Sequence, residues 1–121
     1  MIAEDPNLAK VELIAQALGP LRSFTPCRMA DVDDQAHALG VVHAELILIH
    51  PFREGNGRCS RLLATLMAFQ AGLPALDFGG IRGREKQSYF AAIQAAIACD
   101  YAPITAVFRA VIAKTLRAST R

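Results

Sequence analysis

One proline and two glycines interrupt this chain between two helix-forming segments, and this break constrains the fold more than any other feature. Ahead of the break, four apolar residues recur at helical spacing and predict a helix with one inward face: Leu39, Val42, Leu46 and Ile49. Asp31 or Asp33 can cap the start of this helix. The helix must end at His50, because Pro51 disfavours helical geometry in the residue before it.

The segment after the break predicts a second helix. Gly55 and Gly57 form a turn that leads into a helix over residues 55–71, which Gly72 and Pro74 close. Its side chains are apolar nearly all round: Leu62, Leu63, Leu66, Met67 and Phe69. A helix of this kind is expected at the centre of a bundle.

The remaining segments also read as helices separated by loops. Apolar periodicity predicts helices over residues 6–18, about 84–98 and 102–117. Residues 20–32, with an extended segment near 23–27, and residues 75–83 are predicted to be loops. No internal repeat, linker or long strand pattern is visible in the sequence. We therefore expect residues 1–121 to form one all-α domain, a compact helical bundle with the glycine-rich loop between two central helices.

Composition narrows the functional classes. A chain of 121 residues with 53% hydrophobic and 20% charged residues is typical of a folded globular domain. A formal charge of +2 is too weak to indicate nucleic-acid or membrane binding, and no apolar run reaches the ~18 residues that span a bilayer. Three cysteines without ligand-like spacing argue against disulfides and zinc, which favours a reducing, cytoplasmic setting.

The loop after the first helix has the features of a phosphate site. Gly55 and Gly57 lack Cβ atoms, so their backbone N–H groups can converge on a ligand. They stand where a helix begins, and the first N–H groups of a helix are unsatisfied and carry partial positive charge. Arg58 and Arg61 are three residues apart, on one face of the first turn, where both can bind phosphate oxygens.

Two further residues of the loop complete the chemistry of phosphoryl or nucleotidyl transfer. Glu54 offers a carboxylate for Mg²⁺, which typically binds one or two carboxylates together with substrate phosphates. His50 lies across the same turn and can act as a base. We interpret Phe52 as an apolar anchor that pins this nucleotide-binding loop to the core. Each residue alone has an ordinary structural explanation, and only their joint spacing favours a catalytic site.

Other polar residues are better explained by structure than by function. His37 and His43 are six residues apart on one helix and do not share a face, which argues against a metal pair. Tyr89 could approach a nucleotide base, although core packing is the favoured interpretation. Arg82 and Arg84 follow two glycines and are interpreted as solvated surface.

Residues 50–61 read HPFREGNGRCSR and resemble the loop of the Fic family at every specified position of its pattern. The segment differs from the related Doc branch, which phosphorylates its target and whose loop carries lysine in place of the second glycine. Residues 89–108 are similar to the helix pair that closes the Fic core. The resemblance covers about residues 33–117, and residues 1–32 fit only loosely, as an N-terminal helix and a minimal flap.

The resemblance implies a Fic-type helical fold and transfer of AMP from ATP to a Ser, Thr or Tyr hydroxyl of a target protein, with release of pyrophosphate. By this resemblance, His50 deprotonates the hydroxyl and Glu54 holds Mg²⁺ on the α- and β-phosphates. It also assigns the phosphate ligands: the backbone of Gly55 and Gly57, the side chain of Asn56 and, for the outer phosphates, Arg58 and Arg61.

Two departures from the family pattern bear on regulation and docking. Many Fic proteins carry an inhibitory helix whose glutamate pairs with the second arginine of the loop, and no segment of this sequence has that pattern. Inhibition is then expected from a separate small antitoxin-like protein, unless the chain is unregulated or cut short. Only residues 21–28 can supply the family's β-hairpin flap.

Two other functions fit the same loop. The first is transfer of UMP, phosphocholine or phosphate, because the loop indicates phosphate chemistry and not which part of the donor moves. The second is a nucleotide-binding module without turnover. An intact His50 argues against the second, because a binding module has no need of a base.

Overall fold

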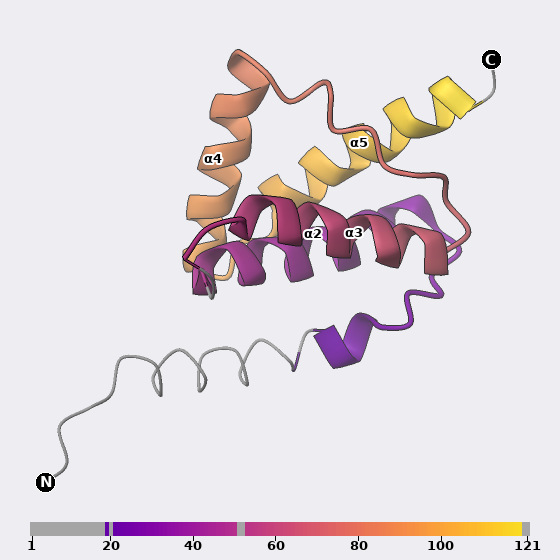
Figure 1. Ribbon diagram of the computed structural model, residues 1–121, viewed down its shortest axis with the longest axis horizontal. Coiled ribbons are helices and arrows are strands. Elements are labelled where there is room, and N and C mark those ends of the chain that lie inside the picture. The colour runs from indigo at the N-terminus through magenta and orange to yellow at the C-terminus, as the bar shows by residue number, and fades with distance from the viewer. Residues whose placement is uncertain (1–18, 20, 51–52, 120–121) are drawn as a thin grey trace, which may run out of the picture.

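The computed structural model describes residues 19, 21–50 and 53–119. Its labelled helices are α2 (Val32–Ile49), α3 (Asn56–Gln70), α4 (Arg84–Ile97) and α5 (Ala102–Ser119) (Figure 1). Within the described ranges no strand occurs, and no helix is long and apolar enough to cross a membrane. The all-α prediction is confirmed, and the four predicted helix positions in these ranges agree with the structure to within two residues. The helix expected over residues 6–18 lies outside the described ranges.

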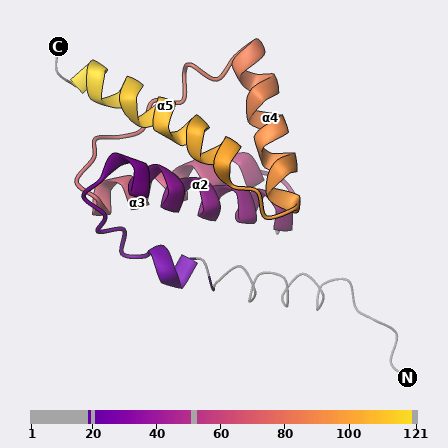
Figure 2. The ribbon, with the colours of Figure 1, turned by 180° about the vertical axis from the view of Figure 1, so that it is seen from behind.

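Helix α2 is the centre of the bundle. It contacts α3, α4 and α5, and α4 also contacts α5. Figure 1 shows α3 in front of α2, and the reverse view in Figure 2 shows α5 crossing the other side of α2. The loop between α2 and α3 therefore lies at one end of the central helix, at the end where α4 finishes and α5 begins (Figure 1).

Helix α2 begins and ends where the sequence predicts. The carboxylate of Asp31 accepts a hydrogen bond from the backbone N–H of Asp33 (2.9 Å), which caps the first turn. Leu39 and Val42 of the predicted inward stripe are buried. Leu46 and Ile49 are only half-buried, and near the end of the helix it is Ile47 and Leu48 that pack against the core. At the other end His50 adopts the left-handed conformation (φ 53°), and its N–H donates to the carbonyl of Leu46 (3.2 Å).

A face of small residues on α2 allows α5 to pack closely against it. Ala36, Gly40 and Ala44 are spaced four apart and are all buried. A Cβ added at Gly40 would lie 3.2 Å from the backbone oxygen of Ile104 on α5. The backbones of α2 and α5 therefore approach more closely than a larger side chain at this position would permit.

The helix predicted over residues 55–71 is confirmed as α3, but the central position expected for it was wrong. Helix α3 packs against α2 alone among the described helices. Leu62, Leu66 and Phe69 point away from α2 and are 60%, 48% and 51% exposed. The apolar side chains of a helix favour burial, but they do not determine which neighbouring helix covers them. Here the close contact with the small-residue face of α2 is made by α5.

The segment before α2 contains no strand among its described residues. Residues 21–24 are helical and residues 25–26 form a bend, so the extended segment expected near 23–27 was also wrong. The backbone N–H of Cys27 donates to the side-chain oxygen of Gln70 (2.8 Å), which ties this segment to the end of α3. The β-hairpin flap suggested for residues 21–28 is accordingly not formed there.

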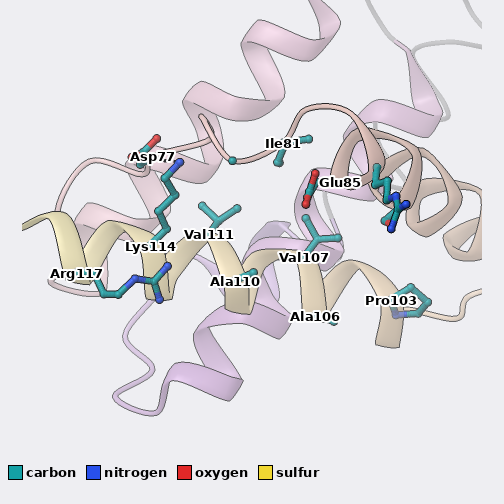
Figure 3. Close-up of a pocket in the computed structure, with 13 residues that line it drawn as sticks. Asp77, Ile81, Glu85, Pro103, Ala106, Val107, Ala110, Val111, Lys114 and Arg117 are labelled. Atoms are coloured by element: carbon teal, nitrogen blue, oxygen red, sulfur yellow. Dashed lines mark ion pairs between the residues drawn. The ribbon is translucent and has the colours of Figure 1, made fainter.

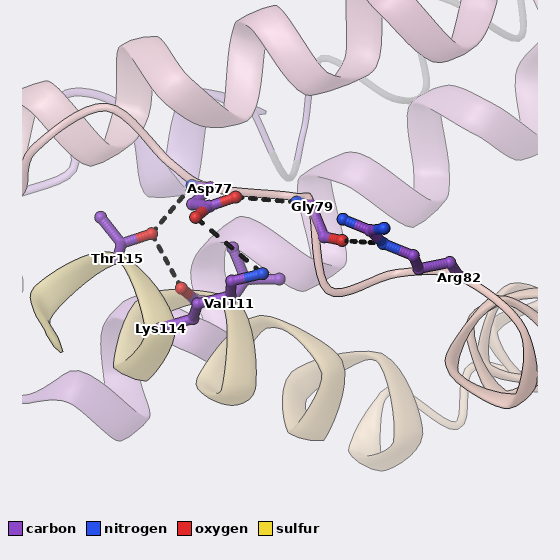
Figure 4. A network of polar contacts seen from close by, with 6 residues as sticks. All are labelled: Asp77, Gly79, Arg82, Val111, Lys114 and Thr115. Atoms are coloured by element: carbon purple, nitrogen blue, oxygen red, sulfur yellow. Dashed lines mark hydrogen bonds and ion pairs between the residues drawn. The ribbon is translucent and has the colours of Figure 1, made fainter. Parts of the chain in front are cut away.

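The predicted loop before α4 is confirmed and is attached to α5 (Figure 4). The N–H of Asp77 donates to the hydroxyl of Thr115 (2.9 Å), and the Asp77 carboxylate accepts from the N–H of Gly79 (2.8 Å). The guanidinium of Arg82 donates to the Gly79 carbonyl (2.8 Å), and Lys114 lies 4.0 Å from the Asp77 carboxylate. These contacts attach the loop that precedes α4 to the side of α5.

Candidate active site

The candidate site is the turn that joins α2 to α3. His50 ends α2 and is exposed, and Gly55 precedes the first residue of α3 with φ 80°. This left-handed conformation is one that glycine adopts without a Cβ clash. Pro51 and Phe52 lie outside the described residues, so the predicted anchoring role of Phe52 stays a prediction.

The start of α3 presents backbone donors. The carbonyl of Gly55 accepts from the N–H of Cys59 (2.9 Å), which closes the first turn. Gly55 has no side chain to cap the helix, so it does not satisfy the N–H groups of the first turn. Uncapped donors at the positive end of a helix dipole favour an anion.

Asn56 connects the two helix ends. It is 6% exposed at the first position of α3, and its Nδ2 atom lies 3.2 Å from Nε2 of His50. An amide N–H at Nε2 requires a lone pair on that nitrogen, so the ring in this arrangement carries its hydrogen on Nδ1. The sequence predicted Asn56 as a phosphate ligand, and the structure places its amide group on the predicted base.

Arg61 lies over the first turn of α3. A Cβ added at Gly57 would lie 3.1 Å from the Nη1 atom of Arg61, so the missing side chain leaves room for this guanidinium. Arg58 and Glu54 are exposed at the same end of the helix. A guanidinium beside the first turn of a helix adds hydrogen-bond donors and positive charge at the positive end of the helix dipole, which suits a polyphosphate.

A cavity of about 290 Å³ begins at Arg61. Apolar and aromatic side chains form much of its wall, together with two cations and a histidine: Phe78, Ile81, Tyr89, Phe90, Arg61, Lys86 and His43. Its volume lies near the lower limit of small-molecule pockets, which suits a single planar ring system. Among the residues predicted for the site, Arg61 belongs both to the loop and to the wall of this cavity.

Sequence reasoning undervalued the contribution of α4. Tyr89 and Phe90 line the cavity, their ring centroids are 5.6 Å apart, and the Lys86 ammonium lies 6.0 Å from the Phe90 ring. Lys86 and the two aromatic residues are three and four positions apart, so they share one helix face. That spacing was visible in the sequence, but nothing in the sequence shows that this face turns towards Arg61.

A larger cavity, of about 580 Å³, lies apart from the predicted catalytic residues (Figure 3). Its wall is made by α5, the start of α4 and the preceding loop, and includes Val107, Ala110, Val111, Ile81 and Arg84. Among the described residues of the loop, 50 and 53–61, none lines it. The chemistry of the loop therefore points to the smaller cavity.

Metal binding by protein ligands alone is not indicated. Among the described residues, no three or more His, Cys, Asp or Glu side chains gather closely enough to hold a metal ion. His37 and His43 do not form a pair: the His37 ring lies edge-on to Phe24 and Tyr101, whereas His43 lies against Tyr89 and Phe108.

Known proteins share the segment that contains this loop. Residues 6–68, more than half of the chain, match the Fic/DOC family. Protein adenylyltransferase fic-1 of Caenorhabditis elegans is 31% identical over 70 residues, which are 58% of this chain and 13% of the relative. Protein adenylyltransferase Fic of Aedes aegypti is 36% identical over 63 residues, which are 52% of this chain and 12% of the relative. Protein adenylyltransferase Fic of Nematostella vectensis is 40% identical over 48 residues, which are 40% of this chain and 10% of the relative. The matched part spans about an eighth or less of these relatives' length. Because the family match covers more than half of its residues, the chain belongs to the Fic/DOC family.

Proposed function

We propose that this chain transfers AMP from ATP to a hydroxyl side chain of a target protein and releases pyrophosphate. The position of Arg61 carries this proposal. Its guanidinium lies beside Gly57 in the first turn of α3 and also lines the 290 Å³ cavity. One ligand could therefore place its phosphates at the turn and its nucleobase in the cavity. A nucleoside triphosphate has both of these parts.

His50 is the proposed general base. It is exposed at the end of α2, so a hydroxyl from another protein can reach it. The Asn56 amide holds Nε2 as the nitrogen with the lone pair, which is the form that accepts a proton. An incoming hydroxyl would replace Asn56 at Nε2, transfer its proton there and attack the α-phosphorus in line with the departing pyrophosphate.

The start of α3 is the proposed phosphate site. The backbone N–H groups of Gly55 and Gly57 and the guanidinium groups of Arg58 and Arg61 would hold the phosphates and stabilise the charge that develops on the leaving pyrophosphate. Because these donors belong to a formed helix, they need little rearrangement when the ligand binds.

Magnesium fits this site as a partner of the nucleotide. Glu54 is an exposed carboxylate beside the phosphate site, and one carboxylate with phosphate oxygens is a common Mg²⁺ environment. Bound there, the ion would neutralise charge on the phosphates.

The relatives' names support AMP as the transferred group. Each of the three relatives described above is named a protein adenylyltransferase. We propose the same reaction for this chain, with a protein as the acceptor. No segment of the sequence has the inhibitory pattern described above, so we expect the purified chain to be active alone. A glutamate from a separate inhibitory protein would compete for the guanidinium of Arg61.

Labelled ATP tests the proposal. The chain is incubated with cell lysate, Mg²⁺ and ATP labelled on the α-phosphate in one reaction and on the γ-phosphate in another. Labelling of protein by the α-label alone is expected. Protein labelled from the γ-phosphate would show phosphate transfer instead, and binding of ATP without labelling would show a non-catalytic module. His50→Ala is the matched inactive control.

A further inference from the structure

The larger cavity lies in the angle between α4 and α5. Figures 1 and 2 show the two helices diverging from one corner of the molecule, with the loop before α4 spanning the open side. This loop is attached to α5 by the hydrogen bond from the N–H of Asp77 to the hydroxyl of Thr115 (2.9 Å). The cavity of about 580 Å³ therefore has walls on three sides, and its volume lies within the range of small-molecule pockets.

The lining of this cavity is aliphatic. Figure 3 shows Val107 and Val111 pointing from α5 towards the loop that carries Ile81. Other apolar residues at helical spacing complete the floor on α5: Pro103, Ala106 and Ala110. At 1.5 Å per residue, the floor from residue 103 to residue 111 is about 12 Å long. No aromatic ring is among the described residues that line the cavity, so an extended hydrocarbon chain fits it better than a planar aromatic ligand.

Positive charge continues the apolar floor. Lys114 and Arg117 also line the cavity, three residues apart on the same face of α5, and Arg84 lines it from the first turn of α4. Against these three cations the lining contains two carboxylates, those of Asp77 and Glu85. The Lys114 ammonium lies 4.0 Å from the Asp77 carboxylate, which is too long for a hydrogen bond. The cavity is therefore complementary to an apolar chain that ends in an anionic group.

A helix of a partner protein fits this space less well. With its side chains a helix is 10–12 Å across, so two turns of it occupy roughly 800–1,200 Å³. This volume exceeds the 580 Å³ of the cavity. An extended acyl chain is much narrower and can lie along α5 beneath the loop.

We propose that this cavity binds an amphipathic anion, whose long aliphatic chain lies along α5 and whose carboxylate lies near Lys114 and Arg117. A long-chain fatty acid has this chemistry. The inference does not rest on AMP transfer, because none of the described residues of the active-site loop lines this cavity. Ile81 lines both cavities, so the ligand would border the proposed nucleotide site without entering it.

Calorimetry of the full chain with laurate tests the proposal, at concentrations too low for laurate to form micelles. One laurate should bind per chain. Dodecyltrimethylammonium keeps the chain and reverses the charge, whereas butyrate keeps the carboxylate and shortens the chain. Each should bind about tenfold more weakly than laurate or weaker still. Equal binding of dodecyltrimethylammonium would overturn the proposal. So would the absence of laurate binding, and a dimer in sedimentation would then indicate that a second copy covers the cavity.

Variants of α5 locate the bound laurate. Ala110 is exposed, so Ala110→Trp should fold, fill the floor and weaken laurate binding by about tenfold or more. Ala118→Trp changes another exposed alanine of α5 that does not line the cavity and should bind as wild type does. Unchanged affinity in Ala110→Trp would overturn the proposal.

The charge is tested separately. Lys114→Met keeps an unbranched apolar stem and removes the ammonium, so it should weaken laurate about three- to tenfold without weakening dodecyltrimethylammonium. Arg28→Met removes an exposed cation that does not line the cavity and should leave laurate affinity unchanged. Equal losses for laurate and dodecyltrimethylammonium in Lys114→Met would show that the ammonium does not hold the carboxylate, which would overturn the proposed orientation.

Measurements on the wild type keep the proposal falsifiable if the variants do not fold. Nuclear Overhauser contacts are expected between the laurate chain and the methyl groups of Val107 and Val111, and their absence would overturn the proposal. Laurate should also bind to the chain saturated with ATP, and its complete exclusion by ATP would place it in the smaller cavity instead. Binding of ATP without binding of laurate refutes only this inference. Binding of laurate without binding of ATP refutes only the proposed function.

Discussion

The side-chain amide of Asn56 lies 3.2 Å from Nε2 of His50 and so joins the first residue of α3 to the residue that ends α2. This contact holds an exposed imidazole with one defined nitrogen towards the phosphate site. The two residues are six apart in the sequence and stand on either side of the turn.

Asn56→Ala should lower kcat by about ten- to hundredfold, because the imidazole is then no longer held with Nε2 in place when the hydroxyl arrives to replace Asn56. Steady-state kinetics of AMP transfer would measure this. The double variant with His50→Ala should be no slower than His50→Ala alone, since Asn56 is expected to act through His50. A further loss in the double variant would show that the main role of Asn56 lies elsewhere.

His50→Ala should reduce AMP transfer by about 10²–10⁴-fold and leave ATP affinity close to wild type. A positioned base contributes to the transition state, and the imidazole adds little to ground-state binding. Transfer of the α-label and calorimetry of ATP binding measure the two quantities. His37→Ala, another exposed histidine of α2, is the control and should transfer AMP normally. Near wild-type transfer by His50→Ala would mean that another group removes the proton.

Arg61→Ala should weaken ATP binding by about ten- to hundredfold and slow transfer with it, because charge-assisted hydrogen bonds to the phosphates are lost. Calorimetry with ATP and with AMP would show which phosphates Arg61 binds, because the loss of affinity should be larger for ATP. Arg22→Ala removes an exposed arginine outside the loop and should bind ATP as wild type does. Equal ATP affinities of Arg61→Ala and wild type would show that Arg61 does not bind the phosphates.

Gly40→Ala should destabilise the fold by about 1–3 kcal/mol, because the added Cβ meets the Ile104 backbone, which cannot move without shifting α5. Urea unfolding would measure the loss. Gly19→Ala is the matched control: a Cβ there has open space around it, so its unfolding free energy should stay within about 0.5 kcal/mol of wild type. A neutral Gly40→Ala would show that α2 and α5 are less tightly packed than the structure indicates.

Stability should depend on pH through His43. Burial lowers its pKa in the folded chain to about 4, below the usual value of 6.5, so the unfolded chain binds more protons between these two values. The stabilisation is complete above the unfolded pKa and is lost as the pH falls towards 4, by up to about 3 kcal/mol. Unfolding curves at several pH values would show this, and His43→Leu should have a shallower dependence in that window.

The sequence alone determined the boundaries of α2 and the position of the active-site loop. These follow from local effects: the Asp31 cap, the conformational limits that Pro51 imposes on His50, and the freedom of Gly55 to adopt positive φ. The family could be identified for the same reason, since the pattern of residues 50–61 is contiguous. Each of these effects acts between residues that are close together in the sequence, so it can be recognised without knowing the tertiary structure.

Only the tertiary structure decided which helix occupies the centre and what surrounds the loop. The apolar composition of α3 suggested a central position, but the close contact of Gly40 with Ile104 places α5 against α2 and leaves Leu62 exposed. The pairing of Arg61 with an aromatic cavity, and of His43 with Tyr89, also joins residues distant in the sequence. Such contacts depend on how helix faces fit together, and helical periodicity shows that a face exists without showing which face it meets.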